Sequence, residues 1–278
     1  MGIGILIMND FSQLRNKITH NYLKSLLIRI DFEDIVEFAN CTKKELTNNL
    51  REYGYKDYEG VVNELNLSIT LKDNSFRQSN SLESRKAFVF VDENDEVRIE
   101  ITPSAILLLK YNKFEEYKGL DKYKQIFLRI FEIINKHEKI YMKRINLKKI
   151  DTFEVSNIDL YKDIFEDFIT CDFTKNPYTD NVSKIAKVIN FFEKGYFVNY
   201  INRLCQGTFF VKNKLKDGYQ FLIEVETYKD INSNEKVLLD SDITTMNNIL
   251  FNIFMASFTE QAREKIAKNI PLIEERDE

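Results

Sequence analysis

The chain has 278 residues, of which 44% are hydrophobic and 30% are charged, values that are ordinary for a globular protein with a sizeable core. Its net charge of -4 at pH 7 disfavours a general nucleic-acid coat and leaves room only for a local basic patch. The eight glycines form neither a GxGxxG nor a P-loop pattern, which excludes the usual backbone cradles for dinucleotides and triphosphates, and we expect no cofactor.

The N-terminus and the cysteines favour a cytoplasmic protein. Residues 1–8 are apolar, but they have no basic leader and are too short for a signal peptide or a membrane span; Met8 is an alternative start to Met1. No other run approaches membrane length, so we expect no membrane association. The three cysteines have no CxxC spacing, and we expect them to be reduced core residues: Cys41, Cys171 and Cys205.

The first part of the chain predicts two strands and one helix. Residues 22–32 are rich in Leu and Ile and predict a strand. A capping box at 42–45 opens a helix that stops at Gly54. Residues 61–71 predict a second strand from an alternating apolar series, Leu65, Leu67, Ile69 and Leu71. The polar segment 73–84 has no period and fits either a loop or an edge strand.

The next part predicts a hairpin, a third strand, a helix and a further strand. The apolar run 87–91 and the alternating run 97–102 flank a charged turn and predict an antiparallel hairpin. Residues 104–109 predict the third strand. Apolar residues then follow the i, i+3, i+4, i+7 rule, which predicts a helix over 120–138 with one apolar stripe for packing on a sheet. Residues 140–150 predict the further strand.

The second half repeats this order in pattern. A helix is expected over 158–169, and 170–180 is the best internal boundary. A hairpin follows, formed by 207–211 and 221–225 around a charged turn at 214–218. A third strand at 237–239 then leads into a long amphipathic helix.

We therefore expect an α+β fold of two related units, 1–170 with the helix 120–138 and 171–278 with the helix 244–267. Each unit consists of a β-hairpin, a strand and a long helix, and the two form one compact body. The antiparallel strands form either two sheets or one continuous sheet, backed by the two helices.

The predicted strand 140–150 carries the local basic patch. As a functional patch, Arg144 and Lys148 on one strand face would hold a phosphate or an acidic partner. Lys143 and Tyr141 would contribute beside them. As a structural feature, these cations pair with carboxylates such as Glu100 on a neighbouring strand. We weigh the structural interpretation above the functional one.

Four carboxylates form the most enzyme-like feature: Glu224, Glu226, Asp240 and Asp242. The two glutamates share a strand face, and the two aspartates come close to them if the next segment pairs as a strand. The set would then hold Mg²⁺ and support phosphodiester chemistry. In the alternative that we favour, the glutamates are the wet face of a strand and Asp242 caps the last helix, because no catalytic lysine lies at nuclease-like spacing.

Two motifs carry a family resemblance. The strand motif is Arg-Ile-Asn-Leu-Lys-Lys-Ile-Asp at 144–151, and Leu-Leu-Asp-Ser-Asp follows at 238–242. With an early strand ending in Arg29-Ile30-Asp31-Phe32, they resemble a sporadically distributed, uncharacterised prokaryotic family with an Arg-Ile-Gly-Leu-Arg-Tyr-Ile-Asn strand motif and a late Leu-Leu-Asp-x-Asp motif. Lys148 replaces that family's Arg and cannot reproduce a bidentate anion contact. The resemblance implies an accessory role on mobile or defence-associated loci and carries no established activity.

The sequence leans against an enzyme. The two histidines, His20 and His137, have no Cys, Asp or His at ligand spacing, so we give both a structural role. We expect a non-catalytic binding or assembly protein that engages another protein, or itself, through a sheet face or a helix. The alternative is a nucleic-acid-linked protein, either a metal-dependent phosphodiesterase at the acidic set or an RNA or DNA binder at the basic strand.

Overall fold

The computed structural model describes residues 11–18, 22–72, 75–94, 96–111, 120–155, 159–166, 184–211, 214–268, 270 and 272. Its strands are β1 (Leu23–Phe32), β2 (Lys56–Lys72), β3 (Ser75–Val91), β4 (Val97–Thr102), β5 (Ala105–Tyr111), β6 (Met142–Val155), β7 (Lys184–Glu193), β8 (Tyr196–Val211) and β9 (Lys214–Ser233). Its helices are η2 (Ser12–Lys17), α1 (Asn40–Glu52), α2 (Leu120–Glu138), α3 (Asp159–Ile164), α4 (Lys236–Ala256) and α5 (Glu260–Ala267). The fold is α+β, as the sequence predicts.

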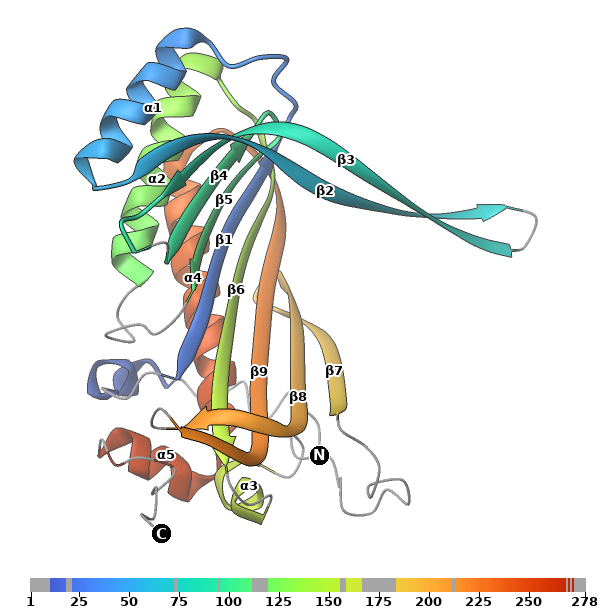
Figure 1. Ribbon diagram of the computed structural model, residues 1–278, viewed down its shortest axis with the longest axis vertical. Coiled ribbons are helices and arrows are strands. Elements are labelled where there is room, and N and C mark those ends of the chain that lie inside the picture. The colour runs from blue at the N-terminus through green and yellow to red at the C-terminus, as the bar shows by residue number, and fades with distance from the viewer. Residues whose placement is uncertain are drawn as a thin grey trace.

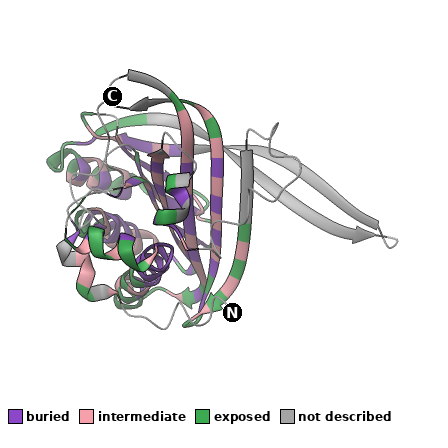
Figure 2. Ribbon diagram, turned by 90° about the horizontal axis from the view of Figure 1, so that it is seen from below, coloured by how far each residue is buried: buried purple, intermediate pink, exposed green. Residues whose placement is uncertain are grey.

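The strands form a single sheet in the order β2-β3-β4-β5-β1-β6-β9-β8-β7, and all neighbouring pairs are antiparallel. Of the two arrangements left open by the sequence, the continuous sheet is therefore the observed one. The helices gather on one side of it (Figures 1 and 2). In β1, Leu26, Ile28 and Ile30 are fully buried, whereas Leu27 and Arg29 between them are half-buried. This period of two places the core between the helices and one face of the sheet.

The two halves of the chain contribute to the sheet in the same way. β1 and β6 are neighbours at its centre, and each is flanked by the last strand of an antiparallel series. The series β2-β3-β4-β5 leads into α2, and the series β7-β8-β9, which is one strand shorter, leads into α4. The order of strands followed by a long helix therefore occurs twice, with β1 and β6 joining the two series. The expected boundary at 170–180 lies outside the described residues.

The start of the last helix was predicted wrongly. Residues 237–239 are not a strand but the first turn of α4. Leu239 is buried, whereas Val237 is 78% exposed and Leu238 is 43% exposed. Only one of these three apolar residues thus belongs to the core, as expected where one helical stripe faces inward.

Other element ends also differ from the predictions. The expected helix 244–267 is two helices, because α4 ends at Ala256 and α5 has its own N-cap, Thr259, whose side chain accepts a hydrogen bond from the Ala262 N–H at 3.3 Å. Thr42 does not cap α1; its hydroxyl donates to Glu138 at 2.6 Å instead. The expected turn at 214–218 is the beginning of β9.

β2 and β3 form a long two-stranded ribbon. They pair residue by residue from Lys56 with Val91 to Lys72 with Ser75, while β4 pairs only with the 88–91 part of β3. Figure 1 shows the rest of the ribbon projecting from the body. The polar segment 73–84 is thus strand rather than loop wherever it is described.

Candidate functional site

One face of the sheet carries no described helix, and we call it the uncovered face. It consists of the residues that alternate with the core residues along each strand. On the central strands and their neighbours, the register places these residues side by side in rows: Leu27 and Arg29 of β1, Asn146 and Lys148 of β6, Glu226 and Tyr228 of β9, and Phe197 and Asn199 of β8. The uncovered face contains both predicted cations of the basic strand.

The cations of the basic strand are matched by carboxylates on the same face. Arg144 donates from Nε to Oδ1 of Asp230 at 2.7 Å, and the hydrogen bond to Asp230 raises the pKa of the guanidinium. Nζ of Lys148 lies 2.5 Å from Oε1 of Glu224, whose other oxygen lies 3.3 Å from Arg203. The face therefore offers paired charges rather than an open phosphate site.

The other residues of the predicted patch have different surroundings. Tyr141 donates its hydroxyl hydrogen to the backbone oxygen of Asn232 at 3.1 Å. Lys143 is exposed and lies at a register shift between Met142 and Arg144. The expected carboxylate partner Glu100 pairs with Arg98 of its own strand and not with the basic strand. Arg144 and Lys148 therefore pair with carboxylates, as the structural interpretation predicts, but these carboxylates are Asp230 and Glu224 and not Glu100.

The structure does not bring together the four carboxylates of the Mg²⁺ alternative that the sequence analysis disfavoured. Glu224 and Glu226 lie on the uncovered face of β9, whereas Asp240 and Asp242 lie on α4, on the opposite side of the sheet. The reason is that residues 238–242 are helical instead of forming a neighbouring strand. In the part of the chain that the structure describes, no group of three or more His, Cys, Asp or Glu could hold a metal ion.

Asp242 has a structural role, but it is not the helix cap that the sequence suggested. The N-cap of α4 is Glu235. Asp242 is buried, accepts a hydrogen bond from the Tyr196 hydroxyl at 2.5 Å and lies 2.8 Å from Nζ of Lys229. Burial, followed by the hydrogen bond to Asp242, raises the pKa of Tyr196. These contacts join α4 to β8 and β9.

An aromatic row crosses the uncovered face, and no motif in the sequence indicates it. The rings of Tyr228 and Phe197 stack at 5.1 Å between centroids, and Phe197 meets Phe192 edge-on at 5.1 Å. The guanidinium of Arg144 lies 5.1 Å from the Tyr228 centroid. Phe192 is 60% exposed and Phe197 is 45% exposed. The run Val188–Phe192 has apolar residues on both strand faces, and its one polar residue, Asn190, is too weak a signal to show which residues face outward.

The geometry of this face suits binding rather than catalysis. Aromatic rings, aliphatic side chains and matched charges are the composition of a protein interface. None of the described helices is long and apolar enough to cross a membrane. No protein-family model matches the chain, and a search of curated proteins finds no significant match.

Proposed function

We propose that this protein is a non-catalytic assembly protein that binds a protein partner through the uncovered face, with a second copy of itself as the first candidate. The observation that carries the proposal is the aromatic row of Tyr228, Phe197 and Phe192. Exposed aromatic rings in contact with one another are depleted on ordinary surfaces and enriched in the buried centres of interfaces. An arginine packed on the row adds a second residue type typical of such centres.

The charges favour a protein partner over nucleic acid. Binding to a phosphate backbone needs cations that release counterions, and it is favoured by an excess of Lys and Arg. On the uncovered face, Arg144 and Lys148 instead lie beside Asp230 and Glu224. A protein surface with both signs of charge can meet such a pattern through complementary pairs.

The ribbon supports self-association. A two-stranded ribbon alone is marginally stable in water. Its backbone register places Leu65 opposite Leu82 and Leu71 opposite Phe76. In a two-fold symmetric dimer, the same patch from both copies meets at the interface, so two ribbons could cover each other's apolar positions.

Replacing both Phe192 and Phe197 with Glu should weaken association at least about tenfold, because charged side chains would then have to be buried in the interface. The measurement is sedimentation equilibrium of the purified full chain. The matched control is Val237→Glu with Leu238→Glu, two exposed apolar residues on the helix side. A strictly monomeric wild-type chain with no partner retained from the native host would contradict the proposal.

Arg144→Glu should leave the fold intact and cost at most about 1 kcal/mol of stability, because the Arg144–Asp230 pair is largely exposed and screened by solvent. In a band-shift assay with RNA and DNA, we expect no binding that depends on this residue. If the wild-type chain shifts nucleic acid and the folded variant does not, the nucleic-acid-linked role replaces the assembly role.

The family resemblance favours an accessory role on a mobile-element or defence locus. Affinity purification from the native host, with mass spectrometry of bound proteins and nucleotides, tests this accessory role. Partners encoded beside the gene would support it, and an empty eluate would count against it.

A further inference from the structure

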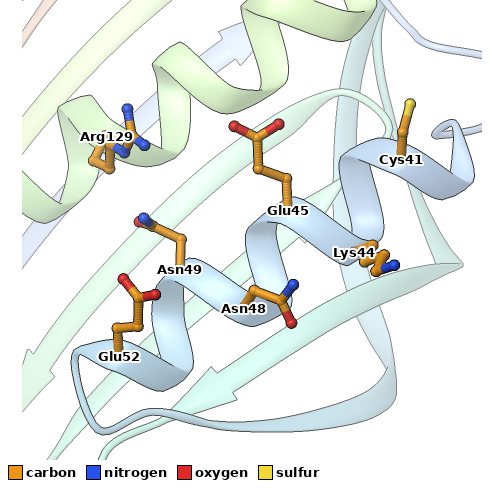
Figure 3. A pocket seen from close by; sticks show the side chains of 7 residues that line it. All are labelled: Cys41, Lys44, Glu45, Asn48, Asn49, Glu52 and Arg129. Atoms are coloured by element: carbon orange, nitrogen blue, oxygen red, sulfur yellow. The ribbon is translucent and has the colours of Figure 1, made fainter.

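The groove between α1 and α2 brings a thiol, an imidazole and a carboxylate together. Cys41 lies in the first turn of α1, Glu45 lies one turn later, and His137 lies in the last turn of α2. Sγ of Cys41 is 3.6 Å from Nδ1 of His137, and Nε2 of the same ring is 2.6 Å from Oε2 of Glu45. Figure 3 shows Cys41 and Glu45 projecting from the same side of α1. Cys41 is exposed, which corrects the core position expected from the sequence.

The hydrogen bonds around His137 set the direction in which a proton would move. The hydrogen bond to His137, and then that to Lys136, lowers the pKa of Glu45 to about 2, so this side chain is a carboxylate at neutral pH. A carboxylate only accepts hydrogen bonds, which assigns the ring proton to Nε2. Nδ1 is then an acceptor directed at the thiol of Cys41. Cys41, His137 and Glu45 thus form a chain of contacts in the roles of nucleophile, base and base-orienting group.

Cys41 lies at the N-terminal end of α1. The first N–H groups of a helix have no partners within it, and the positive end of the helix dipole stabilises a negative charge there. The N-cap residue of α1, Ala39, makes no side-chain cap. At this end of α1, however, the carboxylate of Glu138 already accepts hydrogen bonds from the Ala39 N–H at 2.9 Å and from the Thr42 hydroxyl at 2.6 Å. The group that activates Cys41 is therefore His137 rather than the helix end.

A shallow surface pocket of about 430 Å³ is lined in part by Cys41. Its polar lining includes two cations, Lys44 and Arg129, the carboxylate of Glu52 and the amides of Asn48 and Asn49 (Figure 3). Both signs of charge and two amides suit a small molecule that carries carboxylate and ammonium groups together.

From this geometry we propose that Cys41 is a nucleophilic thiol that exchanges with small zwitterionic disulfides, of the kind formed by amino-acid or short-peptide thiols. His137 takes the thiol proton, and the thiolate attacks one sulfur of the disulfide. A new S–S bond to Cys41 forms as the S–S bond of the small molecule breaks. The released thiolate takes the proton from His137, so atoms, charge and electrons balance. Such a mixed disulfide would add a removable charged group on the helix side, away from the uncovered face.

The experiment measures the rate at which oxidised glutathione modifies each cysteine of the folded full chain, by peptide mapping with mass spectrometry. Cys41 should react at least tenfold faster than the same residue in the urea-unfolded chain. In His137→Asn the rate at Cys41 should fall to within about twofold of the unfolded reference, since the proton acceptor is gone. Circular dichroism confirms that the variant folds. A folded wild-type rate equal to the unfolded one would overturn the proposal.

Two further variants separate the parts of the site. Lys44→Ala with Arg129→Ala should slow the reaction with oxidised glutathione but not that with iodoacetamide, which is uncharged and reports the thiol alone. If both reagents react equally more slowly, or if neither does, Lys44 and Arg129 do not recognise the disulfide.

Glu45→Gln acts through His137. It should slow both reagents and shift the ring ¹⁵N signals of His137, which are easy to assign because the chain has only two histidines. Unchanged signals and rates would overturn the positioning role.

Discussion

Replacing Asp151 with leucine should lower the free energy of unfolding by about 3–5 kcal/mol at neutral pH, because it leaves a buried lysine without its carboxylate. Lys149 and Asp151 are both buried on the helix side of β6. Nζ of Lys149 donates to Oδ1 of Asn247 on α4 at 2.6 Å. Burial, followed by repulsion from the nearby Arg15, lowers the pKa of Lys149, and burial raises the pKa of Asp151; the attraction between Lys149 and Asp151 opposes both shifts. The change is measured by urea unfolding.

The two single variants should respond to pH in opposite directions. In Asp151→Leu, folded Lys149 loses its proton at a lower pH than unfolded lysine, so the unfolded state binds more protons and stability rises with pH between about 7 and 10. In Lys149→Met, folded Asp151 keeps its proton to a higher pH than unfolded aspartate. Stability should then fall as pH rises between about 4 and 7, with a slope of up to about 1.4 kcal/mol per pH unit in each case.

The double variant Lys149→Met with Asp151→Leu is the control. It removes both charges and restores apolar packing, so its stability should lie within about 1 kcal/mol of the wild type. If the double variant is as unstable as the sum of the two single variants, Lys149 and Asp151 do not interact, and the buried pair is not the cause of the instability. If stability changes with pH in the same direction in both single variants, the directions given for the pKa shifts of Lys149 and Asp151 are wrong.

The elements that could be predicted from the sequence are those with one uninterrupted period. The helix 120–138 was predicted with the bounds that α2 has, since Phe127, Ile130 and Ile134 repeat at helical spacing and are all buried. β1 was predicted within one residue for the same kind of reason. Such segments need no information from the rest of the chain.

The site depended on information that one sequence does not contain. The partner of Arg144 is set by the register of β6 against β9, 86 residues further along the chain. Cys41 and His137 are 96 residues apart and meet only because α1 packs on α2. Three apolar residues at 237–239 are too few to distinguish a period of two from one of 3.6. Tertiary packing decided each of these cases.

Phe153→Ala should cost about 3–5 kcal/mol of stability, measured by urea unfolding, because the ring fills the centre of an aromatic core that cannot collapse around the cavity. The side chain is 1% exposed. Its ring lies 4.6 Å from that of Tyr22, 5.3 Å from Phe165 and 5.6 Å from Phe258. Phe165 and Phe258 also form a β-bridge that ties the end of α3 to the turn before α5.

The cavity left by Phe153→Ala should destabilise some elements of the fold more than others. α5 is short and is held to the body in part through Phe258, so hydrogen exchange in α5 should accelerate more than exchange in β1 or β6. Phe192→Ala is the matched control, since its ring is 60% exposed and its loss should cost less than about 1 kcal/mol while weakening association. A similar cost for both substitutions would mean that the aromatic row supports the fold rather than a partner, and the assembly role would lose its main support.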